Sequence, residues 1–287
     1  MGGVVVAVLV AISISARLLE PCEMLWLDQV LRWRLALDLT PDVDRRIVHL
    51  DLGVEDLKSD AKEEYDDAAA IIEEAAACGA AVVAFDSVFL RGTGQTARKL
   101  RETIAAAGNE NQCAVVLGEV LGGGLRRSFP FAARHQPAGF IDASEGSGSV
   151  FRSYRMLYRN GANLEPSFGL AAYLAWLRVD WQRDIQFDKA GEVRWSENEG
   201  GAQSATETPV LMNFRSPWRY SGTKAFRHCT RIELSAMTRE LDPRSRKPLQ
   251  GCILLVGQTE NGDDVGTTPL GSRQPKIGNN IPVTTCH

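Results

Sequence analysis

The 287-residue sequence contains few residues of the types that build metal sites and catalytic dyads. It has four histidines and six cysteines, but no CxxC pair and no Cys–His group at zinc spacing. His228 and Cys229 are neighbours without any recognisable nucleophile motif around them. We therefore predict no structural zinc, and we assign no catalytic residue, no metal ligand and no cofactor.

Glycine-rich phosphate-binding motifs are also missing. The pair Gly92 and Gly94 lacks the third glycine of a dinucleotide fingerprint, and Gly122–Gly124 is not followed by Lys-Ser or Lys-Thr as in a P-loop. No Gly-x-Ser-x-Gly elbow occurs. These glycines are therefore interpreted as turns.

Neither sign of charge dominates, since 32 basic residues face 36 acidic ones for a net charge of −4. This balance gives no overall bias toward nucleic acid. The segment 215–247 is basic and carries interleaved aromatics, which would suit nucleic acid or anionic lipid. A surface that complements the acidic segment 55–74 is the simpler interpretation, and we predict no nucleic-acid partner.

The cysteines give no clear disulfide pattern. Cys78, Cys113 and Cys252 lie in apolar surroundings in the sequence, and we expect them to pack as small hydrophobic side chains. The even count would permit disulfides in an oxidising compartment, but the sequence cannot pair them.

One long uncharged run is present, from Met1 to Ala16. It is shorter than the roughly 20 residues that a spanning helix needs, and no basic n-region of a secretory signal precedes it. A buried helix or strand is one interpretation. We favour a membrane anchor over residues 1–20, with Arg17 at the membrane–water boundary and the true start of the protein upstream.

After this run, short apolar segments alternate with helical ones. The expected strands are 45–52, 80–85, 113–118, 138–142, 154–158, 209–215 and 251–257, and the expected helices are 23–37, 55–78, 96–107, 166–177 and 231–241. Pro166 is expected to open its helix, and Gly79 to stop the helix before it. A hairpin is expected over 184–196 and a polar, mobile loop over 197–208.

This alternation predicts an α/β fold. It would have a mainly parallel central sheet with helices on both faces, an antiparallel hairpin, and the N-terminal membrane-anchor helix. No composition break divides the chain after residue 24, so we expect one domain over 24–287.

Two predicted strands end in acidic residues, Asp51 and Asp86. In open α/β sheets, ligands bind beyond the carboxyl ends of the strands. Paired carboxylates at that edge could bind Mg²⁺ or act as acid and base. They could also cap loops or pair with an arginine.

Five stretches in order carry a resemblance to the second-type CHASE domain, the cyclase/histidine-kinase-associated sensing extracellular domain of bacterial receptors. Residues 79–89, Gly-Ala-Ala-Val-Val-Ala-Phe-Asp-Ser-Val-Phe, are the most specific, being similar to the family's Gly-Ala-x-x-Ile-Gly-Phe-Asp-x-x-Phe. The others are 27–34; 47–52; 139–142 with 150–152 and 166–170; and 213–215 with 251–257, 262–264, 268–270 and 281–282.

The sequence departs from the family at two places. Gly53-Val54 follows the first strand where the family has aspartates, and Gly146–Gly148 stands where the family has Asp-Gly. The resemblance implies a sensor on the extracytoplasmic side of the cell membrane, with downstream transmembrane helices and a cytoplasmic kinase or cyclase. Because the chain stops at His287, we expect it to be a fragment truncated at its C-terminus.

A pocket at the strand ends is the default site for an unknown small-molecule or protein ligand. The candidates are Asp51, Asp86, Arg152, Asn213, Arg215 and Asp263. Structural roles are the alternative, with Asp86 or Asp263 pairing with Arg215. Two rival functions remain open: a metal-dependent hydrolase that uses Asp51 and Asp86, and a module that forms a homodimer through residues 23–37.

Overall fold

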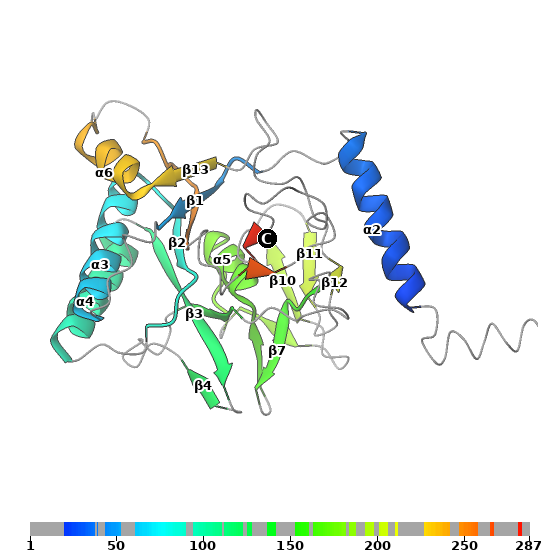
Figure 1. Ribbon diagram of the computed structural model, residues 1–287. Helices are drawn as coiled ribbons and strands as arrows, with labels where there is room; N and C mark the ends of the chain where they lie inside the picture. Colours follow the sequence, from blue (N-terminus) through cyan, green and yellow to red (C-terminus); the bar gives the residue numbers. More distant parts are fainter. Residues whose placement is uncertain are drawn as a thin grey trace, which may run out of the picture.

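The structure of the chain is a computed structural model (Figure 1). The described residues are 20–37, 39, 44–52, 61–89, 94–110, 112–122, 125–127, 137–141, 153–160, 163–181, 184–187, 193–197, 201–205, 210–211, 227–241, 247–257, 265–266 and 281–282. The predicted membrane anchor lies outside them, apart from Glu20. No helix within these ranges is both long enough and apolar enough to cross a membrane.

The centre of the fold is a seven-stranded, mainly parallel sheet, as the sequence predicts. Its strand order is β13-β1-β14-β2-β3, and both β4 and β5 pair with β3. Only β4 runs antiparallel. The strands are β1 (Ile47–Asp51), β2 (Val82–Phe85), β3 (Ala114–Gly122), β4 (Leu125–Arg127), β5 (Ala138–Phe140), β13 (Arg227–Thr230) and β14 (Ile253–Gly257).

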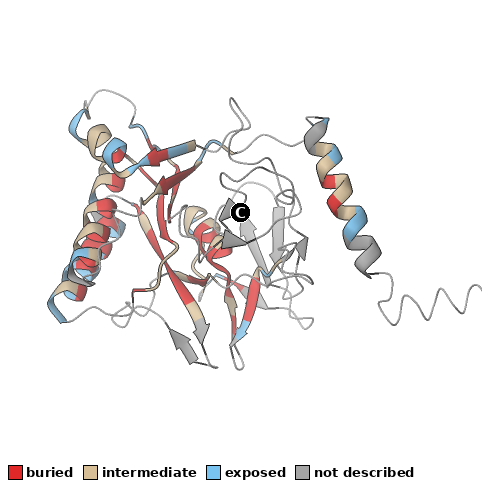
Figure 2. Ribbon diagram, in the orientation of Figure 1, coloured by how far each residue is buried: buried red, intermediate tan, exposed pale blue. Residues whose placement is uncertain are grey.

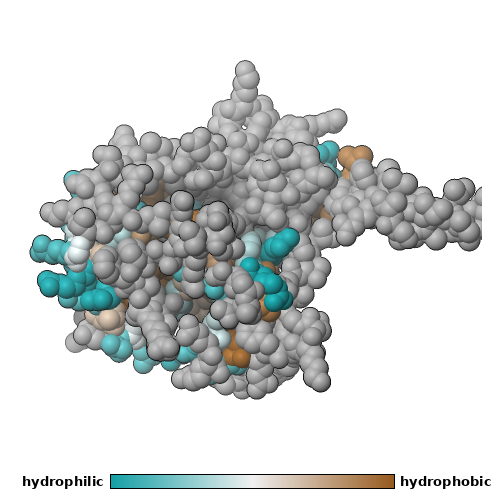
Figure 3. Space-filling model, turned by 90° about the horizontal axis from the view of Figure 1, so that it is seen from below, coloured by the Kyte–Doolittle hydropathy of each residue, from teal (hydrophilic) through white to brown (hydrophobic). Residues whose placement is uncertain are grey.

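Helices cover both faces of this sheet, and the strands between them are buried (Figures 1 and 2). On one face lie α3 (Ala61–Ala77), α4 (Gly94–Glu110) and α6 (Arg231–Arg239), and on the other lies α5 (Phe168–Trp176). Hydrophilic side chains gather on the outer side of α3 and α4 (Figure 3). The result is the expected three-layer α/β arrangement.

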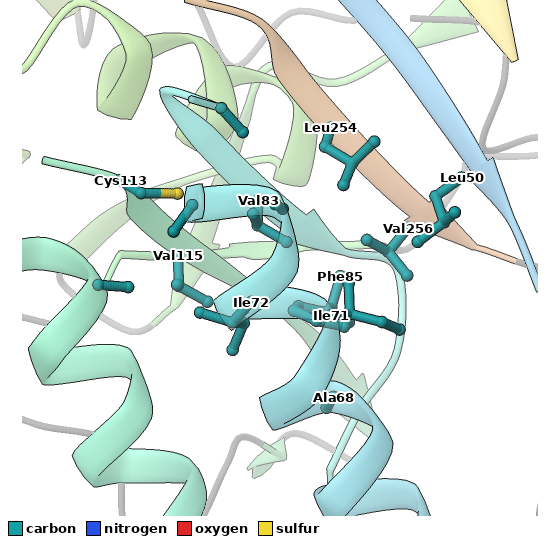
Figure 4. Packing of buried hydrophobic residues seen from close by; sticks show 14 of the residues in the cluster. Leu50, Ala68, Ile71, Ile72, Val83, Phe85, Cys113, Val115, Leu254 and Val256 are labelled. Carbon is teal, nitrogen blue, oxygen red and sulfur yellow. The ribbon is translucent and has the colours of Figure 1, made fainter. Parts of the chain in front are cut away.

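The larger core lies between the sheet and α3. Apolar residues recur along α3 every three or four positions, so one stripe of the helix faces the strands. Ile71 and Ile72 from this stripe pack toward Val83 and Phe85 of β2 (Figure 4). Because side chains alternate along a strand, Leu254 and Val256 of β14 join the same core.

The smaller core lies under α5. This helix contains no charged residue, and its Phe168, Ala171 and Ala172 pack on Val82 and Val116, which point to the opposite face of the sheet. A helix that is apolar nearly all round is typical of a buried position. The sheet is therefore covered on both sides at its centre, as its near-continuous apolar strands require.

The ends of α3 and α5 show how the sequence sets helix limits. Gly79 has a φ of +87°, a left-handed conformation that ends α3 as predicted. At α5, Pro166 belongs to strand β8 (Asn163–Pro166), so the prediction that it opens the helix is wrong. Ser167 is the N-cap instead, because its side chain accepts a hydrogen bond from the backbone N–H of Leu170.

Helix α6 is fixed at its start and along one side. Thr230 and Glu233 form a capping box, in which each side chain accepts from the other residue's backbone N–H. Arg231 pairs with Glu74 of α3, and Ser235 donates to the same carboxylate. These contacts tie the end of β13 to α3.

Antiparallel pairs lie outside the main sheet. The predicted hairpin is confirmed by β9 (Gln186–Phe187) and β10 (Val193–Glu197), which pair antiparallel. The loop predicted over 197–208 is wrong in part, because β11 (Gly201–Ala205) adds to β10 as a third strand. Polar and small side chains hid this strand, since it lacks the alternating apolar pattern.

The expected strand over 154–158 is split in two. β6 (Ser153–Tyr154) pairs with β12 (Val210–Leu211), whereas β7 (Leu157–Asn160) pairs with β8. The remaining short pair is β15 (Val265–Gly266) with β16 (Ile281–Pro282). Leu157 and Tyr158 are both buried, so the predicted half-exposed alternation does not hold here.

Gly139 allows β5 to approach the start of α5. A Cβ atom at this position would lie 2.6 Å from both Phe168 Cα and the Ser167 carbonyl oxygen. These are backbone atoms, which cannot move aside without shifting the helix. Glycine is therefore needed at position 139, in the stretch 139–142 that resembles the CHASE family, so that β5 can pack against the start of α5.

We predict that Gly139→Ala lowers the free energy of unfolding by about 2–3 kcal/mol. Urea denaturation monitored by tryptophan fluorescence measures this change. The matched control is Gly108→Ala, within α4, where a Cβ meets nothing within 4 Å. The control should stabilise the protein by about 0.5–1 kcal/mol. Equal effects of the two substitutions would contradict the packing argument.

Candidate functional site

The register of three strands brings Asp51 and Asp86 to one edge of the sheet. Asp51 pairs with Gly257 of β14, and the Asp86 backbone N–H donates to the Val256 carbonyl. Gly257 therefore lies between the two acids, whose Cα atoms are two strand spacings, or roughly 10 Å, apart. Because successive side chains of a strand point to opposite faces, and Leu50 and Phe85 point into the core under α3, Asp51 and Asp86 lie on the opposite face of the sheet.

Gly257 leaves space between these side chains. A Cβ there would lie 3.6 Å from Asp86 Cβ and 3.7 Å from His49 Nε2. His49 and Asp86 thus approach the same glycine from its two neighbouring strands. A larger residue at 257 would separate them.

Two histidines lie beside Asp51. His49 of β1 and His228 of β13 are register partners, and their rings are stacked with centroids 6.0 Å apart and planes at 29°. His228 Nε2 lies 3.4 Å from Asp51 Oδ2. Because residues two apart on a strand share a face, His49 and Asp51 also point to the same side. The described part of the site is thus Asp51, Asp86, His49 and His228, with Gly257 between the acids; we call these four side chains the edge cluster.

Burial controls the charge of His49. The ring is 4% exposed, and desolvation lowers the pKa of His49 to about 4, with His228 adding a smaller lowering and Asp51 opposing both. His49 is therefore neutral near pH 7. His228 is more accessible, with 37% of its side chain exposed.

A tyrosine stands on the Asp86 side of the edge cluster. The hydroxyl of Tyr154 accepts a hydrogen bond from the Gly169 backbone N–H at 3.3 Å. Burial raises the pKa of Tyr154, and the negative charge of Asp86 adds to this increase. Tyr154 is a neutral hydrogen-bonding group at this position.

The structure thus brings two of the six sequence candidates, Asp51 and Asp86, to the same edge. Arg152, Asn213, Arg215 and Asp263 lie outside the described residues, so their grouping and the suggested pairing with Arg215 stay predictions. Sequence reasoning missed His49, His228 and Tyr154. The signal for His49 was available, since it lies two residues before Asp51 in the same strand.

The hydrolase alternative gains no support from this geometry. Within the ranges that the structure describes, no group of three or more His, Cys, Asp or Glu side chains is arranged to hold a metal ion. That alternative therefore still rests on Asp51 and Asp86, which lie on either side of Gly257 of β14.

The cysteines contribute to packing. Cys78, Cys113 and Cys252 are buried free thiols, as predicted, and Cys229 is a fourth. Burial raises the pKa of both Cys113 and Cys229 to about 11, which keeps these thiols protonated.

Comparison with known families gives a match over nearly the whole chain. The model of the CHASE2 domain matches residues 4–286, nearly the whole chain. The chain belongs to the CHASE2 domain family. CHASE2 domains are sensory domains of signalling receptors, generally on the extracellular side, and are not catalytic modules.

The match confirms the resemblance found in the sequence. No curated protein and no solved structure matches this chain. The binding role of individual CHASE2 residues in this chain therefore has to be argued from the edge cluster itself.

We predict that His49 makes stability depend on pH between about 4 and 6.5. The unfolded chain takes up a proton at the ordinary pKa of 6.5, whereas the folded chain resists it until about 4. The contribution of a neutral His49 to the free energy of unfolding is therefore fully present above pH 6.5. It is lost as the pH falls toward 4, by roughly 3 kcal/mol in total. Urea titrations across this range measure the loss.

His49→Gln removes the titrating group and should flatten this part of the pH dependence. The matched control is Lys99→Gln, which removes an exposed cation paired with Asp66 at 2.8 Å. That surface pair is worth less than about 1 kcal/mol and leaves the slope in place. A slope unchanged by His49→Gln would show that other groups cause it.

Proposed function

We propose that this chain is the extracytoplasmic sensory region of a bacterial transmembrane signalling receptor. In this proposal residues 1–20 anchor the chain in the cell membrane and residues 24–287 form the sensor domain. Membership of the CHASE2 family carries the proposal, because that family consists of extracellular sensory domains of receptors. The output module would be a cytoplasmic kinase or cyclase.

The proposed signal is a shift between two states of the domain. A ligand changes such an equilibrium only by its different affinity for the two states. We place the ligand at the carboxyl edge of the sheet, where Asp51 and Asp86 flank Gly257. This edge is where open α/β sheets bind their ligands. Arg152, Asn213, Arg215 and Asp263 remain candidates for the same site.

Membrane topology tests the proposal. Alkaline phosphatase, which is active only outside the cytoplasm, is joined after His287, and we expect active enzyme in intact bacteria. The matched control is the same fusion beginning at Arg17, which lacks the uncharged run and should leave the phosphatase inactive. A fusion of the full chain that is inactive while a fluorescent-protein fusion glows in the cytoplasm would contradict the sensory location.

We also propose that two copies associate through residues 23–37, which comprise most of α2 (Glu20–Ala36) and the residue after it. Trp26 and Trp33 are 61% and 47% exposed, and their rings meet edge to face with centroids 5.4 Å apart. Trp26, Val30, Trp33 and Leu37 follow the alternating spacing of four and three residues that forms a coiled-coil seam. A second copy of the same helix offers a complementary seam.

We expect Trp33→Ala to weaken self-association of the full chain roughly 30-fold, because exposed tryptophans that become buried at an interface are worth about 2 kcal/mol. Sedimentation velocity over a range of concentrations measures the dissociation constant. The matched control is Ile232→Ala, since Ile232 on α6 is 82% exposed but lies outside the seam. A monomer at every concentration, or equal effects of both substitutions, would contradict the proposal.

A further inference from the structure

The histidine pair of the edge cluster brings together two groups that cannot both be charged at low cost. His49 and His228 are register partners on adjacent parallel strands, and their ring centroids are 6.0 Å apart. His228 is accessible and has the Asp51 carboxylate at 3.4 Å, whereas His49 is almost fully buried. Folding therefore opposes a proton on His49, because burial and the neighbouring His228 both lower its pKa.

We propose that the proton is a ligand of this domain and acts at the edge cluster by loosening strand β13 from β1. This inference rests on the sensory role proposed above. At neutral pH the two strands form a parallel β pair, and the stacked rings of His49 and His228 add to it. As pH falls, His49 takes up a proton in the state in which β13 has separated from β1, whereas it stays neutral in the paired state. The equilibrium therefore shifts toward separation.

The charges around His49 favour this response. On its own strand it faces Asp51, and on β13 it faces His228; across Gly257 of β14, Asp86 is the next titratable group. Helix α5, which packs on β2, β3 and β5 on this side of the sheet, contains no charged residue. The Asp51 carboxylate opposes the lowering of the His49 pKa, and it also lies 3.4 Å from His228 Nε2.

Strand β13 is the element suited to move. It has four residues and stands at the end of the described strand order, with β1 as its neighbour. Arg227 supports it by donating to the carbonyls of Arg45 at 3.2 Å and Pro248 at 3.3 Å. The central strands, by contrast, have strand neighbours on both sides and apolar cores on both faces. Opening β13 therefore breaks the pairing with one strand, whereas opening β14 breaks the pairing with two.

A route leads from β13 to the rest of the domain. Thr230 ends β13 and caps α6, so the strand and the helix form one continuous unit. Arg231 and Ser235 of α6 then hold Glu74 of α3. Separation of β13 would shift α6 against α3, which gives the two states distinct outer surfaces.

Hydrogen–deuterium exchange of the full chain tests the inference. Exchange in β13 and α6 is compared at about pH 7.5 and about pH 5, after correction for the intrinsic pH dependence of amide exchange. We expect the opening equilibrium of β13 to rise roughly 30-fold at the lower pH, because His49 regains its ordinary pKa of 6.5 once exposed. Exchange in β14 should change far less.

His49→Gln should reduce the pH effect on β13 to less than about threefold. If that variant does not fold, His49→Leu gives the same test with an apolar side chain that suits the buried strand. The control is His135→Gln, the same substitution at another histidine, which should keep the full effect. No pH effect in the unmodified chain, an effect that survives loss of His49, or an effect abolished by His135→Gln would overturn the proposal.

This outcome is independent of the topology experiment. A pH response at β13 in a chain whose phosphatase fusion is inactive would retain the proton site and overturn the sensory location. An active fusion without the pH response would do the reverse.

Discussion

The fold depends on one insertion: strand β14, from near the end of the chain, lies between β1 and β2. Ile253, Leu254 and Val256 are buried there, and each such side chain contributes about 1.5–3 kcal/mol by leaving water. Without β14 the first two strands have no partner in common. The sheet therefore requires contacts between residues 206 positions apart (Ile47 and Ile253) and 171 positions apart (Val82 and Ile253), which makes it a fold of long-range contacts and slow assembly.

The same insertion creates the site. Because Gly257 ends β14, the side chains of His49 from β1 and Asp86 after β2 approach each other across a position without a side chain. His49, beside Asp51 and stacked on His228, is buried, and burial lowers its pKa to about 4. The pH dependence of stability and the proposed response to protons thus both arise from the burial of the His49 ring.

Strong local patterns made most of the fold predictable. The apolar runs of β1, β2 and β14 and the helical periodicity of α3 and α4 predict their elements within a few residues. The errors fall where tertiary contacts override local signals. β11 lacks an apolar pattern and is a strand because β10 offers a partner, and Pro166 ends a strand because Ser167 supplies the cap.

The sequence by itself determined the fold class and the strand-end positions of Asp51 and Asp86, since these follow from local composition and spacing, and its five ordered stretches carried the resemblance to the CHASE2 family. Only the tertiary structure decided that Gly257 separates the two acids and that His49 stacks on His228. Strand order and register set those neighbours, and both are decided by long-range burial. No spacing along the chain encodes a contact between residues 49 and 228, because it forms only once β13 pairs with β1.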